Sequence, residues 1–133
     1  MASMVNSIVD DKSIRVIEMA LDARMARQQA IASNIANVNT PGFKRVDLTD
    51  SFKVQFQKAI ADVQAGKELK TRPIPEVGEA TVHGPTRKDG NNVNMEQEVV
   101  ELSKNRLEYE FAAQVMKARF DGLKRAIGGT GGT

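Results

Sequence analysis

Residues 95–127 read MEQEVVELSKNRLEYEFAAQVMKARFDGLKRAI, a stretch whose largely apolar positions recur at alternating spacings of four and three. This heptad register is typical of a long helix that packs lengthwise against another helix. Asn94 and Gln97 are placed as a capping pair at its start, and Gly128 follows its end. The register consists of Met95, Val99, Leu102, Arg106, Tyr109, Ala113, Met116, Phe120, Leu123 and Ile127. At 1.5 Å per residue, the helix would be roughly 50 Å long.

A second register with the same spacing lies near the N-terminus. It consists of Ile14, Ile17, Leu21, Arg24, Gln28, Ile31, Ile35 and Val38. We expect a helix capped by Asp10 or Asp11 and ending within a few residues of Asn39, because Pro41 disfavours helical geometry at the residue before it. The polar members of the two registers, Arg24, Gln28 and Arg106, should meet partners or water, since a buried unpaired charge is costly.

The chain between the two registers has a different character. Residues 50–64 keep helical spacing through Phe52, Phe56, Ile60 and Val63, and Gly66 ends that pattern. Pro and Gly punctuate residues 67–92, so we expect loops and extended chain there, with Glu79–His83 forming a strand only if it finds a partner.

These patterns predict a mainly α protein. Long N- and C-terminal helices would form an elongated, coiled-coil-like pair, with a partly extended, loop-rich middle insert. The predicted organisation is a discontinuous helical domain of residues 1–42 plus 93–128, an outer insert of residues 43–92, and a flexible tail of residues 129–133. The small antiparallel hairpin, with its seam solvated on one side, is the simplest alternative.

Composition excludes several function classes. The 133 residues suit one modest domain, and the chain has no Cys and a single His, His83, so metal sites are improbable. Nineteen Lys and Arg against seventeen Asp and Glu, with 5% aromatics, give neither the one-sided positive field nor the stacking surface that nucleic acids need. We find no basic and apolar leader of the secretory type and no apolar run long enough to cross a bilayer.

Catalytic and cofactor sites are not indicated either. Glu96, Glu98 and Glu101 lie at a helix start, where acids commonly serve the helix dipole, and Asp89 and His83 lie in a Gly- and Pro-rich loop. We therefore predict no enzyme activity, no metal and no cofactor.

Two motifs resemble a known family. Residues 27–45, RQQAIASNIANVNTPGFKR, resemble the N-terminal signature of flagellar rod and hook axial proteins, in which a helix runs into an N-x-A-N-x-x-T-P-G-[YF] turn. Residues 89–127 are similar to the C-terminal pattern of one proximal rod protein of that family, with D-G-N-x-V, N-x-x-x-Y at Asn105 and Tyr109, and a closing L-x-x-A-I. A sister proximal rod protein usually carries a different C-terminal pattern, and it is kept as a narrower alternative.

The resemblance implies a structural subunit of the bacterial flagellar basal body. Members of this family leave the cytoplasm unfolded through the flagellar type III export gate, without a cleaved signal peptide. They polymerise into a helical tube, the rod, which spans the periplasm, transmits torque and continues the export channel. The implied partners are further copies, other rod proteins, rod-base adaptor subunits and the export gate. The terminal helices would line the inner tube.

Three groups of residues are predicted to carry this role. The first, the joint, comprises Asn34, Asn37, Thr40, Pro41, Gly42 and Phe43, whose side chains would satisfy the last helical carbonyls while Pro41 and Gly42 fix the direction of the insert. An ordinary helix stop is the alternative. The second, the helix seam, comprises Ile14, Ile17, Leu21, Ile31, Ile35, Val99, Leu102, Tyr109, Met116, Phe120, Leu123 and Ile127.

The third group is the pair Phe52 and Phe56. It resembles the short apolar element by which early flagellar export substrates dock on the export gate, but the same spacing of four is that of a buried helix face. A different function class, a soluble coiled-coil adaptor or chaperone that binds a partner helix, also fits the two registers. An adaptor should be stably helical in isolation, whereas a rod subunit should have largely disordered termini before assembly.

Overall fold

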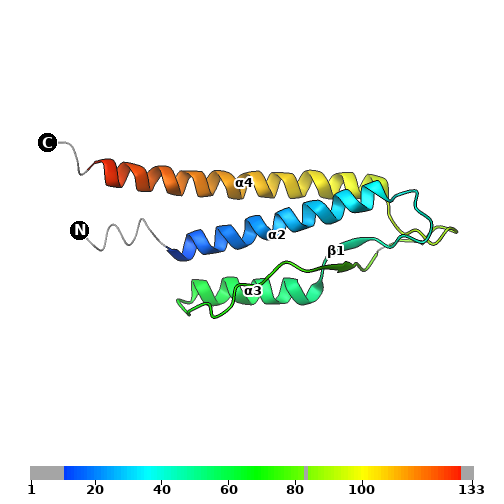
Figure 1. Cartoon of the computed structure of the whole chain (residues 1–133), viewed down its shortest axis with the longest axis horizontal. Helices are drawn as coiled ribbons and strands as arrows, with labels where there is room; N and C mark the ends of the chain where they lie inside the picture. Colours follow the sequence, from blue (N-terminus) through cyan, green and yellow to red (C-terminus); the bar gives the residue numbers. More distant parts are fainter. Residues whose placement is uncertain (1–10, 83, 130–133) are drawn as a thin grey trace.

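The computed structural model describes residues 11–82 and 84–129, and its frame is a pair of long antiparallel helices (Figure 1). Helix α2, Asp11–Ala36, and helix α4, Met95–Gly128, lie side by side along most of their lengths. The mainly α, elongated fold predicted from the two heptad registers is confirmed. The first helix ends two residues earlier than its apolar pattern, which runs to Val38.

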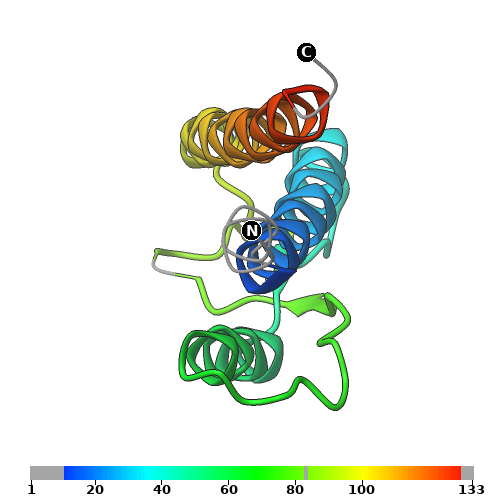
Figure 2. The ribbon, with the colours of Figure 1, turned by 90° about the vertical axis from the view of Figure 1, so that its left-hand side faces the viewer.

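The insert forms a third layer on the opposite side of α2. Helix α3, Asp50–Gln64, has the bounds that its spacing predicts, and α2 lies between α3 and α4 (Figure 2). Strands β1, Val46–Leu48, and β2, Val77–Glu79, pair antiparallel with Val46 opposite Glu79 and Leu48 opposite Val77. The strand expected at Glu79–His83 therefore lies earlier in the chain. Its partner is a segment too short to show a period of two in the sequence.

Local capping explains where the later helices begin. The Thr49 hydroxyl accepts a hydrogen bond from the Phe52 amide at 3.1 Å, and the Asn94 side chain accepts one from the Gln97 amide at 3.2 Å. Asn94 thus acts as the N-cap that the sequence predicts. The cap predicted at Asp10 or Asp11, the loop position of His83 and residues 130–133 of the predicted tail lie outside the described residues and side chains.

The apolar core lies between α2 and the insert. One cluster joins Met19 to Ala59 and Val63, and a second joins Ala23 to Leu48 and Phe52. Phe56 is half-buried and packs against both clusters. The insert is therefore held to α2 by burial of apolar side chains, the strongest stabilising contribution available to a small domain.

The contact between α2 and α4 has the opposite character. All of α4 is described, and its fully buried side chains are Glu98 and Asn105. Helix α4 exposes seven large apolar side chains: Met95, Val99, Val100, Leu107, Phe111, Phe120 and Ile127. In the described part of the chain, none of the helices has the length and apolar character that a membrane span requires.

Candidate functional site

The predicted joint follows the end of α2. The Asn37 amide group donates to the Ser33 carbonyl at 2.8 Å, so one of the last helical carbonyls is satisfied as expected. The Thr40 hydroxyl donates to the Asn37 side-chain oxygen at 3.1 Å. Gly42 has a φ of +74°, a left-handed conformation that glycine adopts at little cost. Pro41 and Gly42 are exposed, and Phe43 is half-buried.

One detail of the predicted joint is wrong. Asn34 does not serve the helix end. Its side chain exchanges two hydrogen bonds with the Val46 backbone, at 2.8 and 2.9 Å, and donates to Glu98 at 3.1 Å. Asn34 lies two residues before the end of α2, so its side chain points away from the helix axis, toward β1 and α4, and does not reach the end of the helix.

Asn91 is a joint residue that sequence reasoning missed. It is fully buried, and its side-chain nitrogen lies within hydrogen-bond distance of the carbonyl oxygens of Asn37, Val38 and Thr40, at 2.9, 3.1 and 2.9 Å. Its D-G-N-x-V context was visible in the sequence. The partners were not, because they lie about fifty residues away in the chain.

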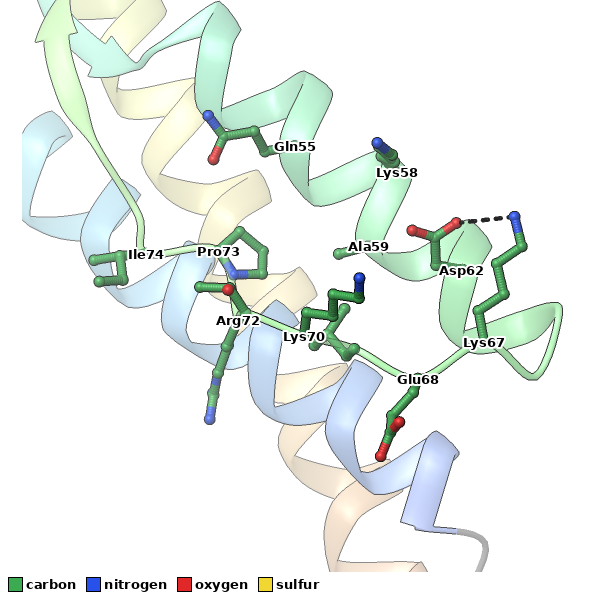
Figure 3. A pocket seen from close by; sticks show the side chains of 12 residues that line it. Gln55, Lys58, Ala59, Asp62, Lys67, Glu68, Lys70, Arg72, Pro73 and Ile74 are labelled. Atoms are coloured by element: carbon green, nitrogen blue, oxygen red, sulfur yellow. Dashed lines mark ion pairs between the residues drawn. The ribbon is translucent and has the colours of Figure 1, made fainter.

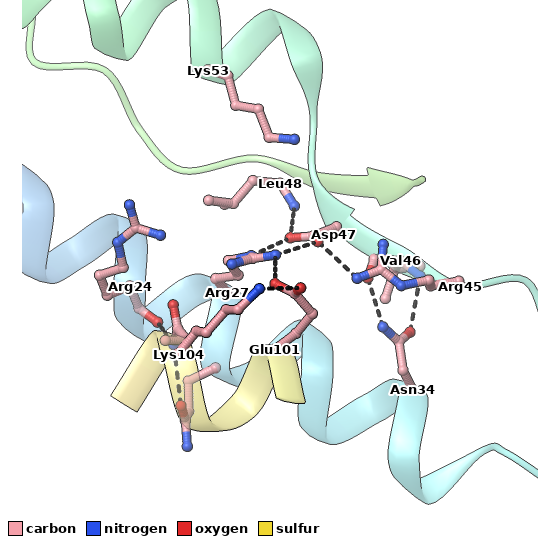
Figure 4. A network of polar contacts seen from close by, with 12 residues as sticks. Arg24, Arg27, Asn34, Arg45, Val46, Asp47, Leu48, Lys53, Glu101 and Lys104 are labelled. Atoms are coloured by element: carbon pink, nitrogen blue, oxygen red, sulfur yellow. Dashed lines mark hydrogen bonds and ion pairs between the residues drawn. The ribbon is translucent and has the colours of Figure 1, made fainter. Parts of the chain in front are cut away.

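Charged side chains connect α2, β1 and α4 into one network (Figure 4). The Arg27 guanidinium forms a two-point contact with the Asp47 carboxylate, at 3.0 and 3.2 Å, and also donates to Glu101 at 2.8 Å. A planar guanidinium suits this task because its donors match a carboxylate in two parallel hydrogen bonds. One arginine of α2 therefore binds a strand residue and a residue of α4 together.

A second arginine extends the same network. Arg45 donates to Asp47 at 3.0 Å and forms a short ion pair with the fully buried Glu98, which also accepts from Asn34. Because each buried carboxylate meets an arginine, the cost of removing it from water is offset by charge-assisted hydrogen bonds. We call the residues Arg27, Asn34, Arg45, Asp47, Glu98 and Glu101 the polar network.

The network shifts the ionisation of its members. Burial would lower the pKa of Arg27, but the hydrogen bonds and negative charges of Asp47 and Glu101 outweigh it, so that pKa is raised. Burial would raise the pKa of Asp47, yet hydrogen bonds from Arg27 and the Leu48 amide hold it below its usual value. Burial would likewise raise the pKa of Glu101, but it is lowered, with Arg27 as its main partner. All three groups are charged at neutral pH.

The structure brings together only part of the predicted seam. Ile31 is fully buried, and the other α2 members, with Leu102, Tyr109, Met116 and Leu123, are half-buried. Val99, Phe120 and Ile127 are 48%, 46% and 65% exposed, so within one chain α4 does not use them against α2. Instead, α4 is rotated so that Glu98 and Asn105 face inward. The Asn105 amide donates to the Arg24 carbonyl at 2.8 Å and to Gln28 at 3.1 Å.

The polar seam residues of α2 meet partners, as expected. Arg24 pairs with Glu108 at 2.7 Å, and Gln28 accepts from Asn105. Arg106 is exposed. Phe52 and Phe56 form a ring pair with centroids 5.7 Å apart, and Phe52 is 2% exposed. In the folded chain, this pair is a packing face.

A broad hollow on the described surface carries no constellation of catalytic or metal-ligating groups. It lies between α3 and the following segment, residues 67–74, with a volume of about 830 Å³ and a lining in which lysines and acids mix (Figure 3). Arg72 fixes the segment to α2 by ion pairs with Glu18 and Asp22. In the described part of the chain, no group of three His, Cys, Asp or Glu side chains could hold a metal ion.

Comparison with known proteins points in one direction. Residues 14–44 match the family model described as flagella basal body rod protein. The chain is similar to flagellar basal body rod protein FlgB of Aeromonas hydrophila, at 30% identity over 125 residues, covering 90% of this chain and 95% of that protein. The corresponding proteins of Borrelia hermsii and Bacillus subtilis (strain 168) are 29% and 28% identical, each over 88% of this chain.

Proposed function

Since this chain belongs to the FlgB family of flagellar basal body rod proteins, we propose that it is a proximal rod subunit that polymerises into a helical tube. Under this proposal, the tube transmits torque and continues the export channel. Location in the flagellar basal body and assembly with other rod components follow from the family.

The observation that carries the proposal is the unfinished burial of α4. In this helix of 34 residues the fully buried side chains are Glu98 and Asn105, so no large apolar side chain of α4 is fully buried by its own chain. Helices in proteins depend on apolar packing for most of their stability, since helices in isolation are marginal in water. Its exposed apolar side chains are therefore explained if α4 packs against neighbouring subunits.

An open apolar groove beside this helix supports the same proposal. It has a volume of about 510 Å³ and lies between α2 and α4, with Ile17 and Ala20 on one wall and Leu107, Phe111 and Val115 on the other. Leu107 and Phe111 are each 70% exposed. Contacts made there would extend the α2–α4 pair sideways, as a tube wall requires.

The proposed division of labour follows the chain. Residues 1–42 with 93–128 form the inner-tube domain, and residues 43–92 form the outer insert. The joint and the helix seam act in assembly. We propose that the chain is exported through the flagellar type III gate without a cleaved signal and that it contacts other rod proteins and rod-base adaptor subunits. Phe52 and Phe56 can serve the gate only before folding, because folding buries Phe52.

The direct test is mass spectrometry of purified, detergent-extracted basal bodies from the source cell. We expect the chain at structural abundance beside ring and rod components. Absence from basal bodies, with the chain found folded in the cytoplasm, would contradict the proposal and favour a coiled-coil adaptor.

A variant test separates assembly from folding. Phe111→Asp places a charge on an exposed apolar site and should leave the melting temperature of the isolated chain within a few degrees of wild type. Incorporation into basal bodies should fall at least tenfold, because burying an unpaired charge is costly. Gln114→Asp, an exposed polar position on the same helix, is the control and should assemble normally. Equal assembly of both variants would show that the Phe111 side of α4 stays in solvent.

A further inference from the structure

Two segments far apart in the chain meet at one end of the helical pair. Residues 37–43 lead from α2 into the insert, and residues 87–93 lead from the insert into α4. They are connected by the Gly42 amide, which donates to the Asp89 carbonyl at 2.8 Å, and by the Asn92 amide, which donates to the Phe43 carbonyl at 3.4 Å. We call these two segments the neck.

Asn91 is the centre of the neck. A carboxamide nitrogen carries two hydrogens, yet it faces three carbonyl oxygens of residues 37–40 at 2.9 to 3.1 Å, so at least one hydrogen is shared. The side-chain oxygen accepts from the Val93 amide at 2.8 Å. The nitrogen and the oxygen of the Asn91 side chain both form hydrogen bonds, and the side chain has no exposure to solvent. This position therefore requires a side chain of asparagine's length that both donates and accepts.

The carbonyls that Asn91 binds lie beyond the last turn of α2. A helix end leaves carbonyl oxygens without helical partners, and those that leave water must find donors elsewhere. Backbone amides of Thr40 and Phe43 serve two of the three, the oxygens of Asn37 and Thr40. Arg87 donates to the third, that of Val38. The returning segment therefore supplies donors to the turn that follows α2.

Two glycines of the neck have backbone conformations that other residues rarely adopt. Gly42 and Gly90 both have left-handed φ angles, +74° and +83°. A side chain on Gly90 would place its Cβ 3.4 Å from the Gly42 Cα. The two glycines permit these conformations at little cost, but they form no side-chain bonds that would hold the two segments together.

We propose that Asn91 is the positioning residue of the joint: it fastens the departure of the insert to its return, so that the insert projects from the helical pair in one fixed direction. Pro41 and Gly42 shape the departing segment alone, whereas Asn91 binds it from the other side. The consequence for rod assembly rests on the proposed function. The closure of the neck is a property of the isolated chain and is tested separately.

The test compares two neighbouring asparagines by hydrogen–deuterium exchange of the full chain. Asn91→Asp removes every hydrogen bond that the side chain donates and keeps the acceptor for Val93. Asn92→Asp is the matched control, because Asn92 uses its oxygen to accept from the Arg45 amide at 2.6 Å and an aspartate keeps that bond. We expect exchange in residues 37–43 and 87–93 to rise about tenfold in Asn91→Asp and to stay unchanged in Asn92→Asp.

Residues 50–64 report whether the effect is local. Helix α3 packs on α2 through apolar clusters remote from the neck, so its exchange should not change in Asn91→Asp. Asn91→Gln, which keeps both donors one methylene further out, should give a smaller loss of protection, again confined to the neck. Equal protection in Asn91→Asp and Asn92→Asp would overturn the inference. A rise in α3 as large as that in the neck, in both Asn91 variants, would also overturn it, because Asn91 would then be a general folding residue.

Incorporation into basal bodies gives the functional readout. Asn91→Asp should incorporate at least tenfold less than Asn92→Asp. If wild-type chain is itself absent from basal bodies, the proposed function fails while the exchange result still decides the role of Asn91. If wild type incorporates and Asn91→Asp matches it despite an opened neck, the direction of the insert does not govern assembly.

Discussion

Helix α2 binds its two neighbours by different means. Toward α3 and β1 it presents Met19 and Ala23, which are buried in apolar clusters. Toward α4 it presents Arg24, Arg27 and Asn34, which form hydrogen bonds and ion pairs, and the last two also bind the strand residues Asp47 and Val46. Apolar contacts give stability with little directional demand, whereas buried polar groups tolerate one arrangement because any other leaves them unpaired.

The difference indicates how a subunit of an assembly can be made. The α2–α3 layer is held by apolar clusters whose members all belong to the one chain. The α2–α4 contact fixes the position of α4 and, by filling its inner side with Glu98 and Asn105, leaves the large apolar residues on its outside. The side-chain oxygen of Asn105 has no hydrogen-bond partner among the described residues, so one buried polar atom of the α2–α4 contact is unsatisfied.

The largest loss of stability should follow a substitution in the apolar contact between α2 and the insert. Phe52→Ala removes a side chain that is 2% exposed, and we expect a loss of about 3 to 5 kcal/mol in the free energy of unfolding. Urea unfolding followed by helical circular dichroism measures it. Phe111→Ala, on exposed α4, is the control and should change stability by less than about 0.5 kcal/mol. Similar losses in both variants would erase the distinction between the two sides of α2.

A substitution in the polar network should cause a smaller loss of stability. Arg27→Met leaves the carboxylates of Asp47 and Glu101 without their shared partner, and we expect a loss of about 3 kcal/mol, at the low end for a buried ion pair because Arg45 still binds Asp47. Arg106→Met, at an exposed position, is the control. Unfolding curves indistinguishable from wild type would show that the network adds no stability and serves only to align α4.

Acid should weaken the polar contact between α2 and α4 before it weakens the apolar contact between α2 and α3. The folded-state pKa values of Asp47 and Glu101 are lowered, so their stabilisation is fully present above the unfolded values of about 4 and is lost as pH falls from there through the folded values. The protection factors of α4 amides, measured between about pH 5 and pH 3, should fall before those of α3. Asp47→Asn removes one titrating group and should make this dependence shallower. A dependence as steep as wild type in that variant would rule out Asp47 as a source.

The smallest effect on stability should come from the joint. Gly42→Val forces a left-handed conformation at a cost of about 1 to 2 kcal/mol, although nothing lies within 4 Å of the added Cβ. Pro41→Gly loosens the same turn. We expect normal expression and reduced rod assembly for each, with Pro85→Gly in an exposed loop as the control. Wild-type swimming of cells carrying both substitutions would remove the joint from the assembly mechanism.

The features readable from the sequence are local ones. The bounds of α3 and the Asn94 cap depend on interactions within about four residues, and a residue pattern records these directly. The family signature, likewise, is a run of neighbouring residues. The side of α4 that faces α2 was harder to predict from the sequence. A heptad pattern favoured Val99 and Arg106, whereas Glu98 and Asn105 face α2, one residue away in each case. The pattern holds no information on Arg45 and Gln28, the distant partners that these two side chains meet.

By itself, the sequence therefore determined the helices, the bounds of α3, the Asn94 cap and the membership of the chain in a family of rod proteins, since each depends on residues close together in the chain. The tertiary structure alone decided which side of α4 is buried, how β1 meets β2 and which carbonyls Asn91 binds. Those choices depend on partners tens of residues apart. In the unfolded chain, a polar side chain can pair with any such partner or with water. Only the folded structure removes the water and leaves it one partner.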